Sequence, residues 1–367
     1  MNAKRKNIAI ISVTQGEGHG AETVLEELLR GWNDNSLSLT VIAPEGSRVL
    51  SVAKEVDVRA VALKTSSDAL VSNMRAAKRV RQALRGCDLL HAWGARSFEV
   101  SWWTANRLGV PACGTLHDHP RAEFHGKIRR QIMAFSANRF HNLVCVSHAV
   151  AEACRQSRYR GPLTVVRNGL RDISITRVDS AKPRIGFLGM YAAWKGFDFV
   201  KDWVNRSENT DLEWHLYGEP ASALRPAAET LQRQFPKNVF LEGNMKTESI
   251  FEGIDILLHC SPHFDPLPTV LIEAARAGIP AVASSAGGAP EIVLDGNTGF
   301  IFDPRDSGSG FDKLQSLSAD AELRRRMGLN ARKHYEQNFR VDLMVSGYRD
   351  FWRGMPDPTP DTRKVYL

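Results

Sequence analysis

The sequence is poor in features that assign a protein to a class directly. No apolar stretch approaches the roughly 18 residues that a membrane-spanning helix requires. The five cysteines are scattered, odd in number and without a C-x-x-C pair, so neither a disulfide framework nor a zinc site is indicated. No D-x-D pair occurs, and nothing else in the sequence requires a bound metal ion. Basic repeats interleaved with aromatic residues, which are typical of nucleic-acid binders, are missing too.

A large excess of one charge sign is also absent. Lys and Arg number 48 against 41 Asp and Glu, which gives a formal net charge of +7. This balance suits phosphate-bearing ligands or an anionic membrane surface and selects neither. With 43% hydrophobic and 24% charged residues over 367 positions, we expect a soluble globular protein of two domains. The start of the chain lacks the longer apolar core and cleavage site of a signal peptide, which predicts a cytoplasmic protein.

What the sequence does contain is a regular alternation of short apolar runs and longer amphipathic stretches. The runs are typical of strands, and stretches such as 22–32 have the helical period. Alternation of this kind predicts parallel sheets with helices on both faces, which is the doubly wound α/β class. The expected strands span 7–13, 37–43, 88–93, 110–116, 142–147, 184–189, 213–218, 238–243, 255–260 and 279–284.

The alternation pauses once, in a polar stretch closed by Pro183. We therefore expect a first Rossmann-like domain over 1–170, a linker over 171–183 and a second Rossmann-like domain over 184–340. The remaining residues, 341–367, are predicted to form an amphipathic helix and a loose tail. Ligands of such sheets bind at the carboxyl ends of the strands, so the two domains are expected to face each other across a cleft.

Two acids, Asp265 and Glu273, flank a mostly apolar seven-residue run that follows one of the expected strands. A helix is predicted from Thr269, whose side chain would cap it, to a terminating Gly278. The first-turn N–H groups of this helix would form an anion site, with Glu273 placed to accept hydrogen bonds from a diol. A phosphate, a diol and a sugar near Asp265 together describe a nucleotide sugar. The spacing equally allows a Glu273 that only stabilises the helix and an ordinary loop acid at 265.

Further candidates lie at the ends of other expected strands. Gly287 and Gly288 would let the backbone approach a ligand closely, although a glycine pair is often only a turn. Lys195, followed by Gly196, is placed to reach a diphosphate as a compact point charge, whereas a lone lysine is more often solvated surface.

The first expected turn contains G-x-G-x-x-A at Gly16, Gly18 and Ala21, which is a relaxed dinucleotide fingerprint. Together with Glu45 after the second strand, it keeps a nicotinamide-dependent oxidoreductase open. The alternative is a glycine-rich turn that lets a substrate approach the helix end.

His117, Asp118 and His119 end another expected strand without the spacing of a metal site, which favours a hydrogen-bonding role. His91 has a similar place, and we favour a satisfied core histidine there. The basic amphipathic stretch 125–140 is expected to be a surface helix with its apolar side in the core, or a helix resting on an anionic membrane.

In combination these motifs resemble the retaining GT-B glycosyltransferases, family 4-like, that build bacterial lipopolysaccharide, capsule and related glycans. The resemblance implies the GT-B fold, with two Rossmann-like domains facing across a cleft and a closing helix that crosses back to the first domain. It covers nearly the whole chain and rests on Gly20-Ala21-Glu22, the strand-end His91 and His117, "VCVS" at 144–147, "VVRNGL" at 165–170, Lys195-Gly196, the paired acids, and "GGAPEIV" at 287–293.

The resemblance also implies roles for the matching residues. Lys195 would neutralise the leaving phosphate, while His117 and Asp265 would lie by the transferred sugar, which makes these three the catalytic candidates. Glu273 would hold the donor ribose. The full set of implied donor-binding residues is Gly18, Gly20, Gly189, Lys195, Asp265, Thr269, Val270, Glu273 and Gly288.

Two positions depart from the family pattern. Met190 stands where the family often has an arginine, so one phosphate-neutralising cation is missing. Asp265 stands where the family usually has Glu, and its carboxyl is one methylene closer to the backbone.

The implied activity is metal-independent transfer of a sugar from a UDP- or GDP-sugar to a glycan or lipid-linked acceptor, with retention of anomeric configuration. The nucleotide sugar is a co-substrate, so no cofactor and no nucleic-acid partner are expected. The enzyme would serve lipopolysaccharide or other cell-surface polysaccharide biosynthesis in the cytoplasm, with 125–140 in peripheral contact with the inner face of the plasma membrane. The alternatives are an NAD(P)-dependent oxidoreductase, a GT-B-fold nucleotide-sugar epimerase and a non-catalytic nucleotide-sugar-binding subunit.

Overall fold

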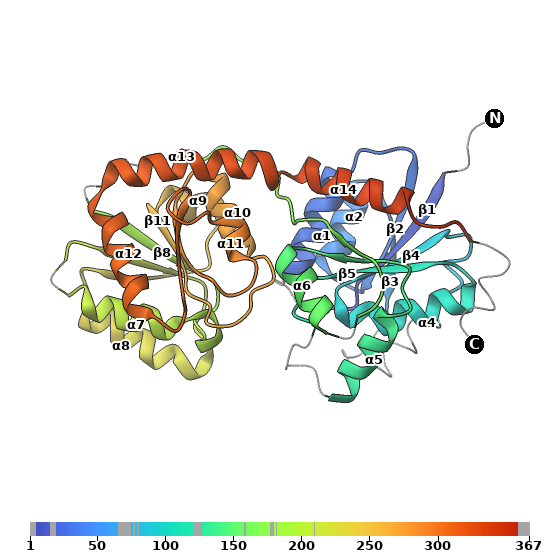
Figure 1. Cartoon of the computed structure of the whole chain (residues 1–367), viewed down its shortest axis with the longest axis horizontal. Coiled ribbons are helices and arrows are strands. Elements are labelled where there is room, and N and C mark those ends of the chain that lie inside the picture. Colours follow the sequence, from blue (N-terminus) through green and yellow to red (C-terminus); the bar gives the residue numbers. More distant parts are fainter. Residues whose placement is uncertain are drawn as a thin grey trace. The chain divides into compact units, whose positions relative to one another are not determined.

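The computed structural model divides the chain into two compact units (Figure 1). Unit 1 contains Met1–Arg171 together with Val341–Leu367, and unit 2 contains Asp172–Arg340. The structure describes residues 5–14, 20–64, 75, 78, 81–120, 127–157, 159–176, 180, 182–208 and 210–358.

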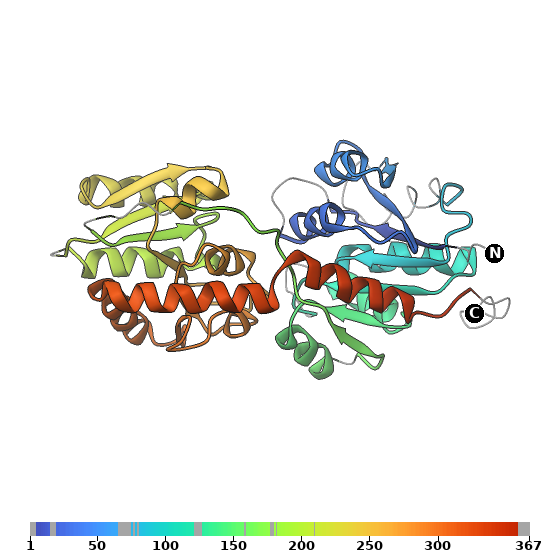
Figure 2. The same ribbon diagram turned by 90° about the horizontal axis from the view of Figure 1, so that it is seen from above.

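Unit 1 is built on a seven-stranded sheet of order β3-β2-β1-β4-β5-β6-β7, in which every pairing is parallel. Helices lie on both sides of this sheet (Figures 1 and 2). The strands are β1 (Lys6–Ile11), β2 (Leu37–Pro44), β3 (Arg59–Leu63), β4 (Leu89–Trp93), β5 (Ala112–Leu116), β6 (Leu143–Cys145) and β7 (Leu163–Val165). The α-helices are α1 (Gly20–Gly31), α2 (Arg48–Glu55), α4 (Phe98–Leu108), α5 (Lys127–Ala137), α6 (His148–Gln156) and α14 (Val341–Arg353), and a short 3-10 turn, η1, spans Ala95–Ser97.

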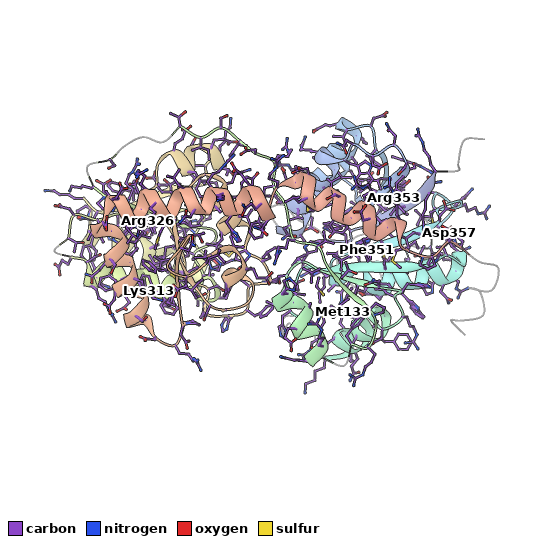
Figure 3. All side chains as sticks on the ribbon, turned by 45° about the horizontal axis from the view of Figure 1, so that its top comes forward. Met133, Lys313, Arg326, Phe351, Arg353 and Asp357 are labelled. Carbon is purple, nitrogen blue, oxygen red and sulfur yellow. The ribbon has the colours of Figure 1, made fainter. Side chains whose placement is uncertain are left out.

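The last helix, α14, belongs to the core of unit 1 although it follows unit 2 in the sequence. Its side chains Tyr348 and Trp352 are fully or almost fully buried among residues of β1, α1 and β4. The start of α14 packs on Gly31 at the end of α1, where a Cβ would lie 2.7 Å from Val341 Cγ2. Figure 3 marks Phe351 near the other end of this helix, and Phe351 is also part of the core.

Unit 2 is built on a six-stranded parallel sheet of order β10-β9-β8-β11-β12-β13. The strands are β8 (Arg184–Leu188), β9 (Glu213–Tyr217), β10 (Val239–Gly243), β11 (Ile256–His259), β12 (Ala281–Ser284) and β13 (Gly299–Phe302). The α-helices are α7 (Phe197–Arg206), α8 (Arg225–Gln234), α9 (Thr247–Glu252), α10 (Thr269–Arg276), α11 (Ala289–Ile292), α12 (Ser307–Ala319) and α13 (Ala321–Asn338), with 3-10 turns η2 (Ala193–Lys195) and η3 (Ser222–Leu224).

The strand order of unit 2 reverses between β8 and β11, because the chain winds outward from β8 to β10 and then outward from β11 to β13. Loops that leave neighbouring strands in opposite directions open a crevice at such a switch point, which is where open α/β sheets bind ligands. The loops after β8 and β11 carry Lys195 and Asp265 respectively. The fold of unit 2 therefore brings these two candidates to one place.

The prediction of parallel doubly wound α/β domains is confirmed, and each expected strand has a counterpart in the structure. Three strands were missed, β3, β7 and β13, and each lies at the edge of its sheet. Edge strands are covered on fewer sides, so many of their residues are only partly buried and the apolar signal is weaker. Among the described residues, no helix combines the length and apolar character needed to cross a membrane.

Candidate functional site

Asp265 lies on the loop that joins β11 to α10. Its backbone N–H donates to Ala286 O at 3.3 Å, and its carbonyl accepts from Gly288 N at 2.8 Å. The loop is thus bonded to the segment that follows β12, the next strand of the sheet. The position of the Asp265 carboxyl is set by two neighbouring strand ends rather than by one.

The glycine pair after β12 is needed because of this packing. A Cβ at Gly287 would lie 2.1 Å from Asp265 O, and a Cβ at Gly288 would lie 2.2 Å from Pro266 O. Gly287 also has a φ of +84°, which disfavours other residues. The sequence interpretation was that these glycines admit a ligand. In the structure the group that approaches them is the Asp265 loop itself.

Helix α10 begins at Thr269, as predicted, and Gly278 with a φ of +69° follows its end. The prediction that the Thr269 side chain caps the helix is wrong. Pro268 is the N-cap residue and no side chain caps the helix, since Thr269 already lies inside the first turn. Pro268 O accepts from Leu271 N at 3.1 Å. The N–H groups of Thr269 and Val270, which precede Leu271, have no partner within the helix and lie at the positive end of its dipole.

Lys195 is positioned by the loop after β8. Its neighbour Gly196 has a φ of +84°, and a Cβ there would lie 2.1 Å from Cys260 O at the end of β11. Ser261 Oγ donates to Trp194 O at 3.0 Å, which ties the same two loops together. The Lys195 ammonium lies 4.8 Å from the centre of the exposed Trp194 ring. Only glycine at 196 permits this close approach of the two loops.

Two side chains converge on one oxygen of Asp265. Lys195 Nζ lies 3.2 Å from Asp265 Oδ2, and His259 Nε2 lies 3.3 Å from the same atom. The side chains of Asp265 and His259 are 14% and 5% exposed, so this cluster is largely shielded from solvent. Burial disfavours the charged carboxylate, but the hydrogen bond from His259 and the Lys195 ammonium outweigh it and lower the pKa of Asp265 to about 2. Asp265 is ionised at neutral pH.

His259 is a site residue that the sequence interpretation missed. It is the last residue of β11, within a run whose other members are apolar. Because an ionised Asp265 can only accept, the Nε2 of His259 carries the proton. Its Nδ1 is buried and makes no hydrogen bond with a described residue. A polar residue at the end of an otherwise buried strand was the signal that could have identified it.

The remaining donor candidates of unit 2 lie at the same edge of the sheet. Thr269, Val270 and Glu273 are on α10 and each is half-buried. Gly189 follows β8 with a φ of +119°, and no atom outside its chain neighbours lies within 4 Å of the place where its Cβ would be. Met190, which follows it, is 52% exposed. Open space therefore adjoins the end of β8.

The candidates of unit 1 have different surroundings. His117 follows β5 and its ring lies 4.8 Å from that of Trp93. Burial lowers the pKa of His117 to about 3, and its Nε2 has no hydrogen-bond partner among the described residues. Gly20 is the first residue of α1. Gly16 and Gly18 lie outside the described residues.

His91 is a core histidine, as favoured from the sequence. Its Nδ1 accepts from Trp352 Nε1 at 2.9 Å, so the proton is on Nε2, which lies 2.8 Å from Thr115 Oγ1. Thr115 Oγ1 is in turn 3.0 Å from the Tyr348 hydroxyl. Both ring nitrogens are used inside the core of unit 1, and His91 is not part of a ligand site.

Among the residues that the structure describes, no group of three or more His, Cys, Asp or Glu side chains could hold a metal ion. The site at the β8–β11 switch point instead presents one ammonium, one carboxylate and a helix N-terminus. Such a set can bind a phosphate-bearing ligand that also carries hydroxyl groups.

Comparisons with known proteins agree with this chemistry. The family model for glycosyl transferases group 1 matches residues 171–334, and that for glycosyltransferase family 4 matches residues 18–172. A D-inositol 3-phosphate glycosyltransferase of Streptomyces avermitilis is 42% identical over 68% of this chain and 61% of its own. The N-acetyl-alpha-D-glucosaminyl L-malate synthase of Bacillus anthracis is 30% identical over 32% of this chain, and the matched segment spans 33% of that relative.

The solved structures give the same picture at lower identity. The Anabaena protein HepE, crystallised with UDP and glucose, superposes with a TM-score of 0.82 at 19% identity. The alignment covers 95% of this chain and 100% of HepE. This similarity concerns the fold of the chain.

Proposed function

We propose that this chain, which is a glycosyltransferase of the GT-B fold, moves a hexosyl group from a nucleotide-diphospho-sugar to a hydroxyl of a glycan or lipid-linked acceptor. The observation that carries the proposal is the convergence of Lys195 and the start of α10 on the Asp265 loop at the switch point of unit 2. Because HepE was crystallised with UDP, we propose UDP as the nucleotide.

Lys195 and the first turn of α10, including Thr269 and Val270, would bind the two phosphates of the donor. A preorganised ammonium and a helix N-terminus stabilise negative charge as it develops on a leaving group, and they do so without reorganisation of solvent. Gly189 supports this arrangement, since the space next to it is open. With Met190 in the place of a family arginine, Lys195 would provide the cationic charge at this position.

Glu273 would bind the ribose. It lies one helical turn after Thr269 on α10, so its carboxylate follows the diphosphate at the distance of a pentose ring. A carboxylate accepts two hydrogen bonds and is therefore suited to a vicinal diol.

Asp265 would hold a hydroxyl of the transferred sugar. Its Oδ2 accepts from His259 and Lys195, while Oδ1 makes no hydrogen bond with a described residue. The lowered pKa keeps the carboxylate ionised, so Oδ1 can accept from the sugar at any physiological pH.

We further propose transfer with retention of configuration and without a metal ion. The bond from the anomeric carbon to the phosphate oxygen breaks, and a bond to the acceptor oxygen forms on the same face. The departing diphosphate takes the acceptor proton. His117, Gly18 and Gly20 of unit 1 would contribute to the sugar and phosphate contacts of the reaction.

The setting we propose is the synthesis of a cell-surface polysaccharide or lipopolysaccharide at the inner face of the plasma membrane. The support is the surface of α5, on which Ile128 and Phe135 are 76% and 46% exposed beside basic residues. Two exposed apolar side chains on a basic helix suit contact with an anionic bilayer.

Calorimetric titration with UDP tests the donor site. Lys195→Ala and Glu273→Ala are each expected to weaken UDP binding about tenfold or more, because each removes a charge-assisted contact. Lys201→Ala and Glu248→Ala are the matched controls, since both residues lie on other helices of unit 2, and they are expected to leave binding unchanged. Equal UDP affinity in all four variants would contradict the proposed donor site.

A donor panel with lipid-linked acceptor extracts, followed by mass spectrometry, tests the reaction. Transfer is expected to fall at least about a hundredfold in Lys195→Ala, because one stabilising group for the leaving charge is lost. Nucleotide binding without sugar transfer would identify a silent binding subunit. Binding of NAD without response to UDP or GDP would identify an oxidoreductase.

A further inference from the structure

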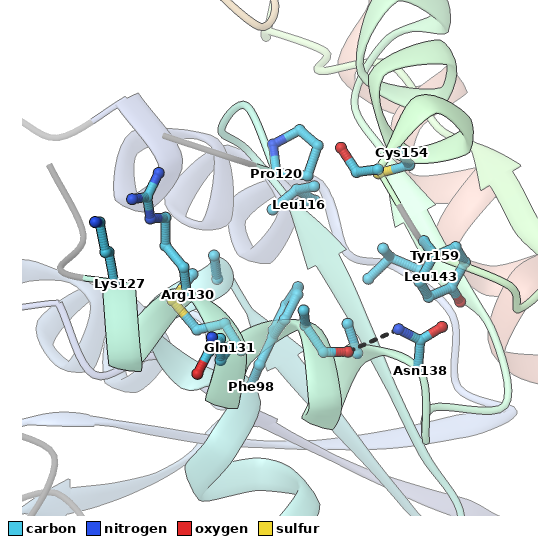
Figure 4. A pocket seen from close by; sticks show the side chains of 15 residues that line it. Phe98, Leu116, Pro120, Lys127, Arg130, Gln131, Asn138, Leu143, Cys154 and Tyr159 are labelled. Atoms are coloured by element: carbon cyan, nitrogen blue, oxygen red, sulfur yellow. Dashed lines mark hydrogen bonds between the residues drawn. The ribbon is translucent and has the colours of Figure 1, made fainter. Parts of the chain in front are cut away.

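Unit 1 contains a pocket that the proposed donor site does not use. Its volume is about 560 Å³, which is within the range of small-molecule pockets, and it lies under α5 (Figure 4). Its walls come from α5, α6 and the chain around the ends of β4 and β5. The described lining residues are Ala95, Phe98, Leu116, Pro120, Lys127, Arg130, Gln131, Met133, Ala134, Ala137, Asn138, Leu143, Cys154, Ser157 and Tyr159.

Three polar side chains of the pocket lining already have partners within the protein. The Tyr159 hydroxyl donates to Pro162 O at 3.1 Å, and Ser157 Oγ donates to Ala153 O at 2.7 Å. Asn138 Nδ2 donates to Ala134 O at 2.9 Å, a bond drawn in Figure 4. A buried water needs two to four polar partners, and this wall offers few. The interior therefore suits a hydrocarbon better than a polar ligand.

One end of the pocket is cationic. Lys127 and Arg130 lie together there, with Tyr159 and Leu143 at the opposite end (Figure 4). Neither cation forms a hydrogen bond or ion pair with another described residue, and no acidic side chain is among the described lining residues. Arg129 on the same helix is different, since it pairs with Glu99 at 2.9 Å. The two unpaired charges at the pocket end favour an anionic group.

We propose that this pocket binds an anionic amphiphile, with the hydrocarbon chain between α5 and α6 and the acidic headgroup on Lys127 and Arg130. That this amphiphile is the glycosyl acceptor rests on the proposed function. The binding site itself does not, because it needs no sugar donor.

Calorimetry with decyl phosphate, below its micelle concentration, tests the site in the full-length protein. Decyl phosphate is expected to bind, decanol to bind more weakly, and inorganic phosphate not to bind. Ala134→Phe fills the pocket and is expected to lower the affinity for decyl phosphate at least tenfold. Ala321→Phe is the control, because it makes the same substitution at an exposed alanine of α13 that does not line the pocket, and is expected to change the affinity less than twofold.

A second variant pair tests the headgroup contact and does not depend on tolerance of the larger side chain. The double variant Lys127→Glu with Arg130→Glu is expected to lower the affinity for decyl phosphate about tenfold and to leave the affinity for decanol unchanged. Lys54→Glu with Arg59→Glu changes the net charge equally on exposed residues of α2 and β3 and is expected to have no effect.

Flotation with phosphatidylglycerol vesicles separates the pocket from a simple surface contact. If Lys127→Glu with Arg130→Glu abolishes vesicle binding while Ala134→Phe binds both vesicles and decyl phosphate normally, the cations contact a membrane surface and the pocket proposal is overturned. No binding of decyl phosphate to the wild-type protein also overturns it. UDP binding, measured in the same samples, tests the proposed donor site of unit 2 separately from the pocket of unit 1.

Discussion

At the scale of single residues, the candidate site is defined by the contacts of the Asp265 carboxylate. Lys195 and His259 both contact Oδ2 of Asp265, which stands where the family resemblance leads us to expect a glutamate. The sequence allowed Asp265 and Lys195 to be predicted, because each follows an apolar strand at the edge where ligands bind. The contact between Lys195 and Asp265 could not be predicted, and neither could the hydrogen bond from His259 to Asp265. The Lys195 contact requires β8 and β11 to be neighbours in the sheet, which the sequence does not show.

The Asp265 carboxylate gives a prediction for acid stability. Since its pKa is lowered to about 2 in the folded protein, its contribution is fully present above the unfolded value near 4 and is lost as the pH falls toward 2. Asp265→Asn is therefore expected to be less stable than the wild type at pH 6, by about 2 kcal/mol, and the difference is expected to vanish by about pH 2. Urea unfolding of both proteins across this range measures it. A difference independent of pH would show that charge is not the cause.

The core histidine gives a second residue-scale prediction. His91→Leu leaves the Trp352 N–H without its partner and removes one of the two partners of the Thr115 hydroxyl, which is expected to cost about 1–3 kcal/mol at pH 7. His148→Leu, at an exposed residue of α6, is the control and is expected to change stability by less than about 0.5 kcal/mol. Denaturant unfolding followed by tryptophan fluorescence measures both.

The same histidine sets a pH dependence. Burial lowers the pKa of His91 to about 3, so the unfolded chain binds the proton first as the pH falls below about 6.5. The contribution of the neutral His91 to the free energy of unfolding is fully present above pH 6.5 and is lost as the pH falls toward 3. The stability of the wild type is thus expected to fall more steeply than that of His91→Leu over this window, and parallel curves would contradict the assignment.

At the scale of elements, the helix and strand positions were largely predictable because buried parallel strands are near-continuous apolar runs. The helix start at Thr269 was also predicted from residue type. Residue type alone could not show which backbone segments pack against each other. Gly287 and Gly288 were interpreted as ligand contacts or as a simple turn, and the packing of the Asp265 loop on them was not foreseen.

Gly288 provides a test of this packing. Gly288→Ala places a Cβ against the Pro266 carbonyl, so it is expected to lower stability by about 1–3 kcal/mol and to weaken UDP binding by displacing the Asp265 loop. Gly308→Ala, in helix α12 with no atom closer than 3.5 Å to the new Cβ, is expected to be neutral or to stabilise the protein by up to about 1 kcal/mol. Calorimetry and thermal unfolding of the two variants measure the contrast.

At the scale of the whole molecule, unit 1 is assembled from both ends of the chain. The chain passes to unit 2 between Arg171 and Asp172, and the two neighbours are anchored differently. Arg171 pairs with Glu27 of unit 1 at 3.0 Å, while Asp172 pairs with Arg332 of unit 2 at 2.5 Å. The amphipathic period of the last helix was readable from the sequence. The family resemblance implied that this helix crosses back to the first domain, and in the structure it belongs to unit 1.

Removal of α14 tests this assembly. A chain ended after Arg340 loses the buried Tyr348 and Trp352, and unit 1 is expected to lose more than about 5 kcal/mol and to unfold at a lower temperature. Unit 2 is expected to keep its UDP binding, since its core contains no residue of α14. A chain ended after Pro358 keeps every described contact and is expected to melt as the full chain does. Scanning calorimetry with and without UDP resolves the two units.

The place of α14 also sets the order in which a newly made chain matures on the ribosome. When the first 171 residues have emerged, the surface of α1 and β4 that α14 later covers is still bare, and it stays so while Asp172–Arg340 is translated. At ordinary rates of translation this interval is on the order of 10–30 s. Unit 2, which is translated after the first 171 residues, can therefore complete its fold before unit 1 does. During this interval we expect a chaperone to bind the incomplete unit 1.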